Sequence, residues 1–363
     1  MTDFLAVPGA VDGTGSDAGV PAHYGNPLRE QRLLAAGTAV VDLSHRSVLT
    51  VSGTDRLSWL EALTSQQLVS LKPGESSETL VLSQTGRIEH AVHVFDDGTD
   101  TWLLVERDEA PELAAWLTSM RFRQQVQVTD RSADFATLGS LGMPAVPIAA
   151  PGGIPVHWRD PWTATLPGGY QYASAEGHPA SDWHWSEFLV ARSDLAGIAA
   201  RAASGELPVA GFLAAEALRI AAWRPRLATE VDEKSIPHEL DWLRSAVHLK
   251  KGCYRGQETV AKVHNLGHPP RRLVMLYLDG SEGVLPARGD DVVLGDAIIG
   301  SITSVGLHFE LGPIALAVIR RGADPAAELQ VRAGSITLSA TQQVIVPPDA
   351  GATAPVPRLP RLR

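Results

Sequence analysis

Short β-rich runs recur along most of this chain of 363 residues, and they constrain its fold more than any other feature. Among them are TLVLS, RIEHAVHVF, TWLLVE and QVQVTD, each containing β-branched or aromatic residues. Runs of this kind, bounded by turn-forming residues, are typical of strands. Because helical segments are interspersed with them, the pattern predicts an α+β fold.

Four segments have the apolar spacing of helices. In residues 54–65, Leu57, Leu60 and Leu63 share one face and Thr54 is the expected N-cap. The other predicted helices cover residues 108–120, 185–203 and 209–223. The region between the second and third, rich in Pro, Gly and Trp, reads as loops between short strands.

Short strands with glycine-centred turns fill residues 271–346. Gly295 and Asp296 lie between two β-branched runs, as the residues of a hairpin turn do. This portion therefore predicts a small β-barrel or sandwich. The expected organisation is a flexible N-terminal arm (1–22), a first α+β domain (23–130, completed by 205–268), a second α+β domain (131–204), a C-terminal β-barrel (269–346) and a disordered tail (347–363).

Composition and charge exclude several classes of protein. Hydrophobic residues make up 44% and charged residues 20%, the balance of a globular protein. No segment reaches the ~18 apolar residues of a membrane span, and the N-terminus lacks the features of a signal peptide. The net charge of −10 argues against binding to nucleic acid or to anionic lipid. We expect a cytoplasmic protein that binds neither nucleic acid nor a membrane.

The only cysteine, Cys253, excludes an internal disulfide and any metal site built from this chain's thiolates alone. His90 and His93 lie on opposite faces of a predicted strand, so they cannot chelate one ion together, and no metal ligands are assigned. Cations stand close to the thiol in sequence, at Lys250, Lys251 and Arg255. They could favour the thiolate, whereas the alternative is a buried, inert cysteine.

The string KGCYRGQE around this thiol is specific enough to indicate a family. It resembles the hallmark of the YgfZ-type folate-binding proteins that maintain iron–sulfur clusters, which are relatives of the glycine-cleavage T protein, an aminomethyltransferase. The matching residues are Lys251, Gly252, Cys253, Tyr254, Gly256, Gln257 and Glu258. The resemblance implies a three-domain, ring-like aminomethyltransferase fold with a C-terminal β-barrel and a central channel for tetrahydrofolate.

Function follows from the same resemblance. It implies a tetrahydrofolate-binding accessory protein that serves iron–sulfur client or assembly proteins, with Cys253 as the reactive group and the other motif residues near the cofactor. Glu216 and Arg219, three residues apart on a predicted helix, could face the channel as partners for folate, or could form an ordinary surface pair. Lys251 is expected to promote thiol reactivity by its charge, so that arginine could replace it.

Two alternatives remain open from the sequence. One is a folate-dependent aminomethyltransferase or a demethylating relative, in which case the protein is an enzyme. Where those transferases carry an Asp-Asp pair, this chain aligns with His90-Ala91, and the missing carboxylate weighs against transfer chemistry. The other is a non-catalytic, folate-gated interaction module in which the thiol only packs.

Overall fold

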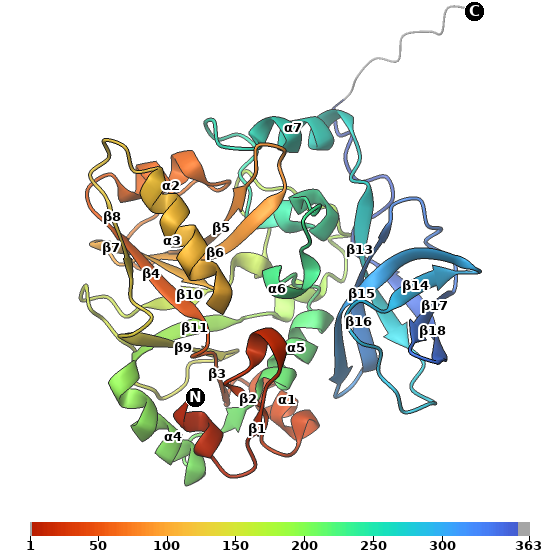
Figure 1. Ribbon diagram of the computed structural model, residues 1–363, viewed down its shortest axis with the longest axis horizontal. Helices are drawn as coiled ribbons and strands as arrows, with labels where there is room; N and C mark the ends of the chain where they lie inside the picture. The colour runs from red at the N-terminus through yellow and green to blue at the C-terminus, as the bar shows by residue number, and fades with distance from the viewer. Residues whose placement is uncertain (1, 355–363) are drawn as a thin grey trace, which may run out of the picture.

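The computed structural model describes residues 2–354 of the chain. Figure 1 shows two sheet-containing parts beside a β-barrel, with helix α5 (Phe212–Ala221) between the barrel and the rest. None of the described helices is long and apolar enough to cross a membrane. The predicted disordered tail lies partly outside the described residues, whereas residues 352–354 are hydrogen-bonded to helix α7 (Gln257–Leu266) and to Gly267 after it.

The first sheet is antiparallel and has the order β5-β6-β7-β4-β8. Its strands are β4 (Ser47–Ser52), β5 (Ser76–Leu82), β6 (Ile88–Asp96), β7 (Asp100–Val105) and β8 (Gln127–Asp130). Helices α2 (Arg56–Leu63) and α3 (Ala110–Ser119) confirm two predicted helices, although Asp55 and not Thr54 stands at the N-cap of α2. Both helices bury apolar side chains in one core with the sheet.

The second sheet has the order β10-β11-β9-β3-β12. Its strands are β3 (Val40–Asp42), β9 (Phe135–Ser140), β10 (His157–Arg159), β11 (Ser186–Ala191) and β12 (Val209–Ala210). Since β3 and β12 lie outside residues 131–204, this sheet does not follow the domain boundary expected from sequence. The helix predicted over 185–203 is wrong in its first half, where β11 pairs with β9 and β10. A fully buried apolar run cannot be assigned by periodicity alone.

The N-terminal residues are not a free arm, contrary to the sequence-based expectation. They form η1 (Asp3–Ala6), β1 (Val11–Asp12), η2 (Gly15–Asp17) and β2 (Pro21–His23). Phe4 is fully buried in a core shared with α4 (Leu195–Ala203), and this apolar burial anchors the segment.

The C-terminal strands close into a barrel, as predicted. In barrel order they are β13 (Arg271–Leu278), β16 (Gly312–Arg320), β15 (Ala297–His308), β14 (Asp291–Leu294), β17 (Leu329–Ala333) and β18 (Ile336–Val344). Gly295, with φ of 59°, and Asp296 form the predicted hairpin turn. One set of barrel side chains fills the barrel, while Leu273, Met275 and Ile314 join the main core of the molecule.

The remaining helices are short and lie in the connections. They are α1 (Pro27–Ala35), α6 (Leu227–Glu230), η3 (Arg107–Glu109), η4 (Pro161–Thr163), η5 (Pro179–Asp182), η6 (Arg192–Asp194), η7 (Pro237–Leu240) and η8 (Trp242–Arg244).

Asp241, between η7 and η8, is fully buried, and burial raises the pKa of its carboxyl to about 7. The folded protein therefore keeps a proton that the unfolded chain releases between about pH 4 and 7, so stability from this group falls as the pH rises through that window. We expect Asp241→Asn to remove a slope of up to about 1.4 kcal/mol per pH unit from the free energy of unfolding. Urea unfolding from pH 4 to 7 measures it. The exposed Asp296→Asn is the control, and an unchanged slope in Asp241→Asn contradicts the expectation.

Candidate functional site: a central pocket and the cysteine loop

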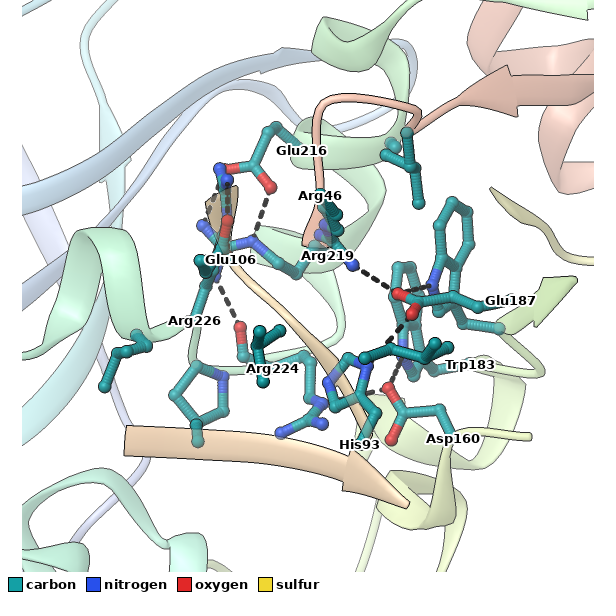
Figure 2. Close-up of a pocket in the computed structure, with 18 of the residues that line it drawn as sticks. Arg46, His93, Glu106, Asp160, Trp183, Glu187, Glu216, Arg219, Arg224 and Arg226 are labelled. Carbon is teal, nitrogen blue, oxygen red and sulfur yellow. Dashed lines mark hydrogen bonds and ion pairs between the residues drawn. The ribbon is translucent and has the colours of Figure 1, made fainter. Parts of the chain in front are cut away.

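A pocket lies where the first sheet, the second sheet and helix α5 meet (Figure 2). We call it the central pocket, and its cavity measures about 60 Å³. Four arginines and four carboxylates line it together with His93, so its formal charges balance when all eight are ionised. The charged lining residues are Arg46, Arg219, Arg224, Arg226, Glu106, Asp160, Glu187 and Glu216.

Glu187, on β11, is fully buried and accepts hydrogen bonds from three side chains. It has no exposed surface and accepts hydrogen bonds from Arg46, from His93 Nδ1 at 3.0 Å and from Trp185 Nε1 at 3.3 Å. Burial pushes its pKa upward, but the charges of Arg46 and His93 outweigh burial and hold the pKa below its usual range. Glu187 is therefore an ionised carboxylate at neutral pH.

Arg224 joins the two sheets at the bottom of the pocket. Its Nη2 donates to Glu78 at 2.6 Å and its Nε to Asp160 at 2.9 Å, and all three side chains are buried. The guanidinium also lies over the rings of Trp162 and Trp242, 5.2 and 5.7 Å from their centroids. It therefore compensates two carboxylates that no other cation in the described residues pairs with.

Glu216 and Arg219, the pair singled out from sequence, both line the central pocket and are not a surface pair. Arg219 donates to both carboxylate oxygens of Glu216 at 2.8 Å. It also donates to Glu230 of α6 at 2.9 Å and to Ser304 of the barrel at 2.7 Å. This cluster ties α5 to the barrel beside the pocket.

Arg226 connects the pocket to the N-terminal segment. It donates to both oxygens of Glu106, at 2.6 and 2.8 Å, and to both oxygens of Asp17, at 2.7 and 3.1 Å. Glu106 is half-buried; burial raises its pKa, but the charges of Arg226 and Arg46 outweigh burial and lower the pKa to about 2. Both carboxylates are thus ionised, and residues predicted to form a mobile arm support the pocket wall.

Two guanidinium nitrogens of the pocket have no internal partner. Arg46 Nε and Arg224 Nη1 are buried and make no hydrogen bond to any described residue. A buried donor without a partner costs roughly 1–3 kcal/mol. The lining of the pocket therefore contains two buried donors without partners in the described part of the chain.

The cysteine loop, residues 251–256, lies apart from these groups and lines no part of the central pocket within the described chain. Cys253 is exposed, so the alternative of a buried thiol is wrong. Lys251 points its ammonium at backbone: Nζ donates to the carbonyls of Glu61, of Thr64 at 2.5 Å and of Gln66 at 3.1 Å. Burial lowers its pKa to about 8.

The other two cations close to Cys253 in sequence, Arg255 and Lys250, differ in their contacts. Arg255 donates to Glu89 at 2.6 Å, in an ion pair with the first sheet, while Lys250 is exposed. Of the three cations proposed to favour the thiolate, two are therefore engaged elsewhere.

The remaining motif residues shape the loop. Gly256 has φ of +83°, and a Cβ there would lie 2.5 Å from the carbonyl oxygen of Ser83, so only glycine fits against the β5–β6 turn. Tyr254 is buried beneath the Lys251 ammonium, 4.8 Å from its ring centroid. Gln257 donates to the Lys251 carbonyl at 3.3 Å. Gly252 and Glu258 are exposed.

The sequence reasoning missed most of the central pocket. Arg46, His93, Glu106, Asp160, Glu187, Arg224 and Arg226 were not singled out as site residues. A usable signal existed in IAAWRPRLATE, where two arginines stand in an apolar stretch and so require buried partners. Glu187, inside the apolar run WSEFLVA, carries the same signal.

Comparison with known proteins agrees with this architecture. Residues 1–149 match the family described as GCVT N-terminal domain. The chain is 26% identical over 302 residues to an aminomethyltransferase of Symbiobacterium thermophilum, covering 78% of this chain and 79% of that protein. It is 24% identical over 338 residues to one of Thermus thermophilus, covering 90% and 93%.

A solved structure shares the fold. The crystal structure of the glycine cleavage system aminomethyltransferase T from Bartonella henselae superposes with a TM-score of 0.74 at 18% identity, over 93% of this chain and 94% of that one. The α+β fold with a closed C-terminal barrel is thus the aminomethyltransferase fold, as predicted from sequence. Together the similarities support placement in the GcvT-like superfamily.

Proposed function

We propose that this protein binds tetrahydrofolate in the central pocket and supports the assembly or repair of iron–sulfur clusters in client enzymes, as YgfZ-type proteins do, with Cys253 as its reactive group. The observation that carries the folate part is the pocket itself, which has balanced charges and two unpartnered donors, Arg46 Nε and Arg224 Nη1. The tetrahydropterin of this ligand is a neutral two-ring system whose planar pyrimidine edge carries both donors and acceptors, which the carboxylates and guanidinium groups of the pocket can meet.

The lining residues divide naturally between the two kinds of pterin atoms. Arg46 and Arg224 can donate to ring acceptors, while the Glu216 carboxylate, whose oxygens each keep a lone pair beyond the bond from Arg219, can accept from ring N–H groups. When bound, tetrahydrofolate supplies a carrier for one-carbon units. The cavity of about 60 Å³ is too small for a pterin as it stands, so binding requires lining side chains to move.

The pocket lacks a free carboxylate for transfer chemistry. Ala91, at the position aligned with the Asp-Asp pair, lines the pocket without an ionisable group. Both oxygens of Glu216 accept from Arg219, and Glu187 is held by three donors. A general base must be within reach of its proton and able to take it. This arrangement favours a folate-binding role without transfer.

Folate binding can be tested at Arg46, which is partly exposed at the pocket and whose replacement leaves Glu187 two other donors. We expect Arg46→Met to weaken tetrahydrofolate binding by about tenfold or more, the equivalent of one charged hydrogen bond. Isothermal titration calorimetry under anaerobic conditions measures it. The exposed Arg288→Met is the matched control. Wild-type protein that does not bind tetrahydrofolate would refute the folate part outright.

The role of Cys253 is tested in cells. We expect Cys253→Ser to fold normally, because the side chain is exposed, and to fail to restore iron–sulfur enzyme activities in cells that lack the native protein. Those activities are assayed beside the melting temperature of the purified variant. Full restoration by a stable Cys253→Ser protein contradicts a reactive role for the thiol, and folate binding by the same protein is measured separately.

A second candidate is a folate-dependent aminomethyltransferase, favoured by the similarity to the aminomethyltransferases of Symbiobacterium thermophilum and Thermus thermophilus. It predicts that the purified chain forms methylenetetrahydrofolate from an aminomethyl donor. Detection of that product above the rate of the Arg46→Met variant would replace the accessory role by this one.

A further inference from the structure

A second cavity, of about 360 Å³, adjoins the central pocket, because Asp160 and Trp185 line both. We call it the lateral cavity. It lies along β10, the edge strand of the second sheet, and its size falls within the range of small-molecule sites, roughly 300–1,000 Å³. Its other lining residues are Leu141, Gly142, Met143, His157, Arg159, Thr163, His184 and Ser186.

One lining side chain is buried without a hydrogen-bond partner among the described residues for one of its ring nitrogens, and a second is an exposed cation. His157 is only 7% exposed, and its Nε2 is buried without a hydrogen bond to any described residue. Arg159, two residues on along the same face of β10, is exposed and forms no ion pair within residues 2–354. Thr163 and Ser186 line the same space.

The charge of the cavity selects the kind of ligand. Arg159 is the only Lys or Arg among the lining residues, while Asp160 is already compensated by Arg224. Burial, aided by Arg159, lowers the pKa of His157 to about 4, so its ring is neutral at pH 7. One guanidinium matches one carboxylate, which it can bind in a bidentate manner. Leu141, Met143 and Trp185 add apolar surface for the rest of a small molecule.

We propose that the lateral cavity is a binding site for a small monocarboxylate with a short apolar portion, whose carboxylate pairs with Arg159. This ligand is distinct from the folate proposed for the central pocket. The lateral cavity shares a wall with the central pocket, and Trp185, which donates to Glu187 there, is the side chain through which occupancy is visible.

The test follows the indole N–H signal of Trp185 by NMR on the full-length protein, assigned by its loss in Trp185→Phe. Butyrate is expected to shift this signal saturably, and butan-1-ol, of the same apolar size, to leave it in place. Arg159→Gln should weaken butyrate binding about tenfold or more, as loss of a charged hydrogen-bonding partner does, and the control Arg288→Gln should not. The proposal is overturned if butyrate causes no saturable shift, or if Arg159→Gln binds butyrate as tightly as the wild type. Arg159 would then be a charged residue that prevents the edge strand β10 from pairing with another chain.

A second arm separates a free carboxylate from the glutamyl carboxylates of folate. Calorimetry compares tetrahydrofolate monoglutamate and triglutamate on wild-type and Arg159→Gln protein. Unchanged affinity of Arg159→Gln for both folates, with butyrate binding intact in the wild type, supports a separate site, whereas equal weakening of both folates contradicts it. Weakening of the triglutamate alone, without a butyrate shift, overturns the proposal in favour of a folate-tail site.

Discussion

Replacing Lys251 by alanine is expected to lower the free energy of unfolding by about 3 kcal/mol, because three backbone carbonyls lose a charged donor together. The carbonyls belong to Glu61, Thr64 and Gln66, at the end of α2 and just beyond it, so the lysine fastens the cysteine loop to the first sheet's layer. Urea unfolding measures the loss. The neighbouring exposed Lys250→Ala is the matched control, with an expected change within about 0.5 kcal/mol.

Lys251→Arg distinguishes this role from the charge-based one expected from sequence. A planar guanidinium does not fit a compact cage of carbonyls built around an ammonium, so arginine should also destabilise the protein. Iodoacetamide labelling of Cys253 supplies the second measurement. Slower labelling of Lys251→Ala without a loss of stability would support thiolate activation and contradict the fastening role.

The barrel and the pairing of Glu216 with Arg219 on α5 could be predicted because their signals are local. Gly295 and Asp296 specify a hairpin within a few residues, and helical spacing puts Glu216 and Arg219 on one face. The environment of Lys251 has no such signal. Its partners are backbone carbonyls 185 to 190 residues away in sequence, and every residue has a carbonyl. Similarly, Phe4 alone did not reveal that the N-terminal segment is anchored.

The pocket arginines show the same limit on sequence reasoning. Arg224 meets Glu78 across 146 residues and Asp160 across 64, so no spacing rule connects them. What the sequence does contain is the requirement for a partner, because an arginine in an apolar stretch cannot be buried alone. Which carboxylates lie beside the arginine is decided by the tertiary structure.

Arg224→Met is expected to cost about 3–5 kcal/mol of stability, because it leaves the buried carboxylates of Glu78 and Asp160 without their cation. The contacts of the guanidinium with Trp162 and Trp242 are lost as well. Urea unfolding measures the change, with the exposed Arg288→Met as the control.

The triple variant Arg224→Met, Glu78→Gln, Asp160→Asn then identifies the source of that cost. Glutamine and asparagine keep an acceptor oxygen for Trp242 and Trp183, which donate to these two side chains, but carry no charge. If the penalty comes from uncompensated charge, the triple variant should be more stable than Arg224→Met alone, although two substitutions have been added. If the triple variant is less stable, the packing and cation–π contacts of Arg224 contribute more to stability than its compensation of the two carboxylates does.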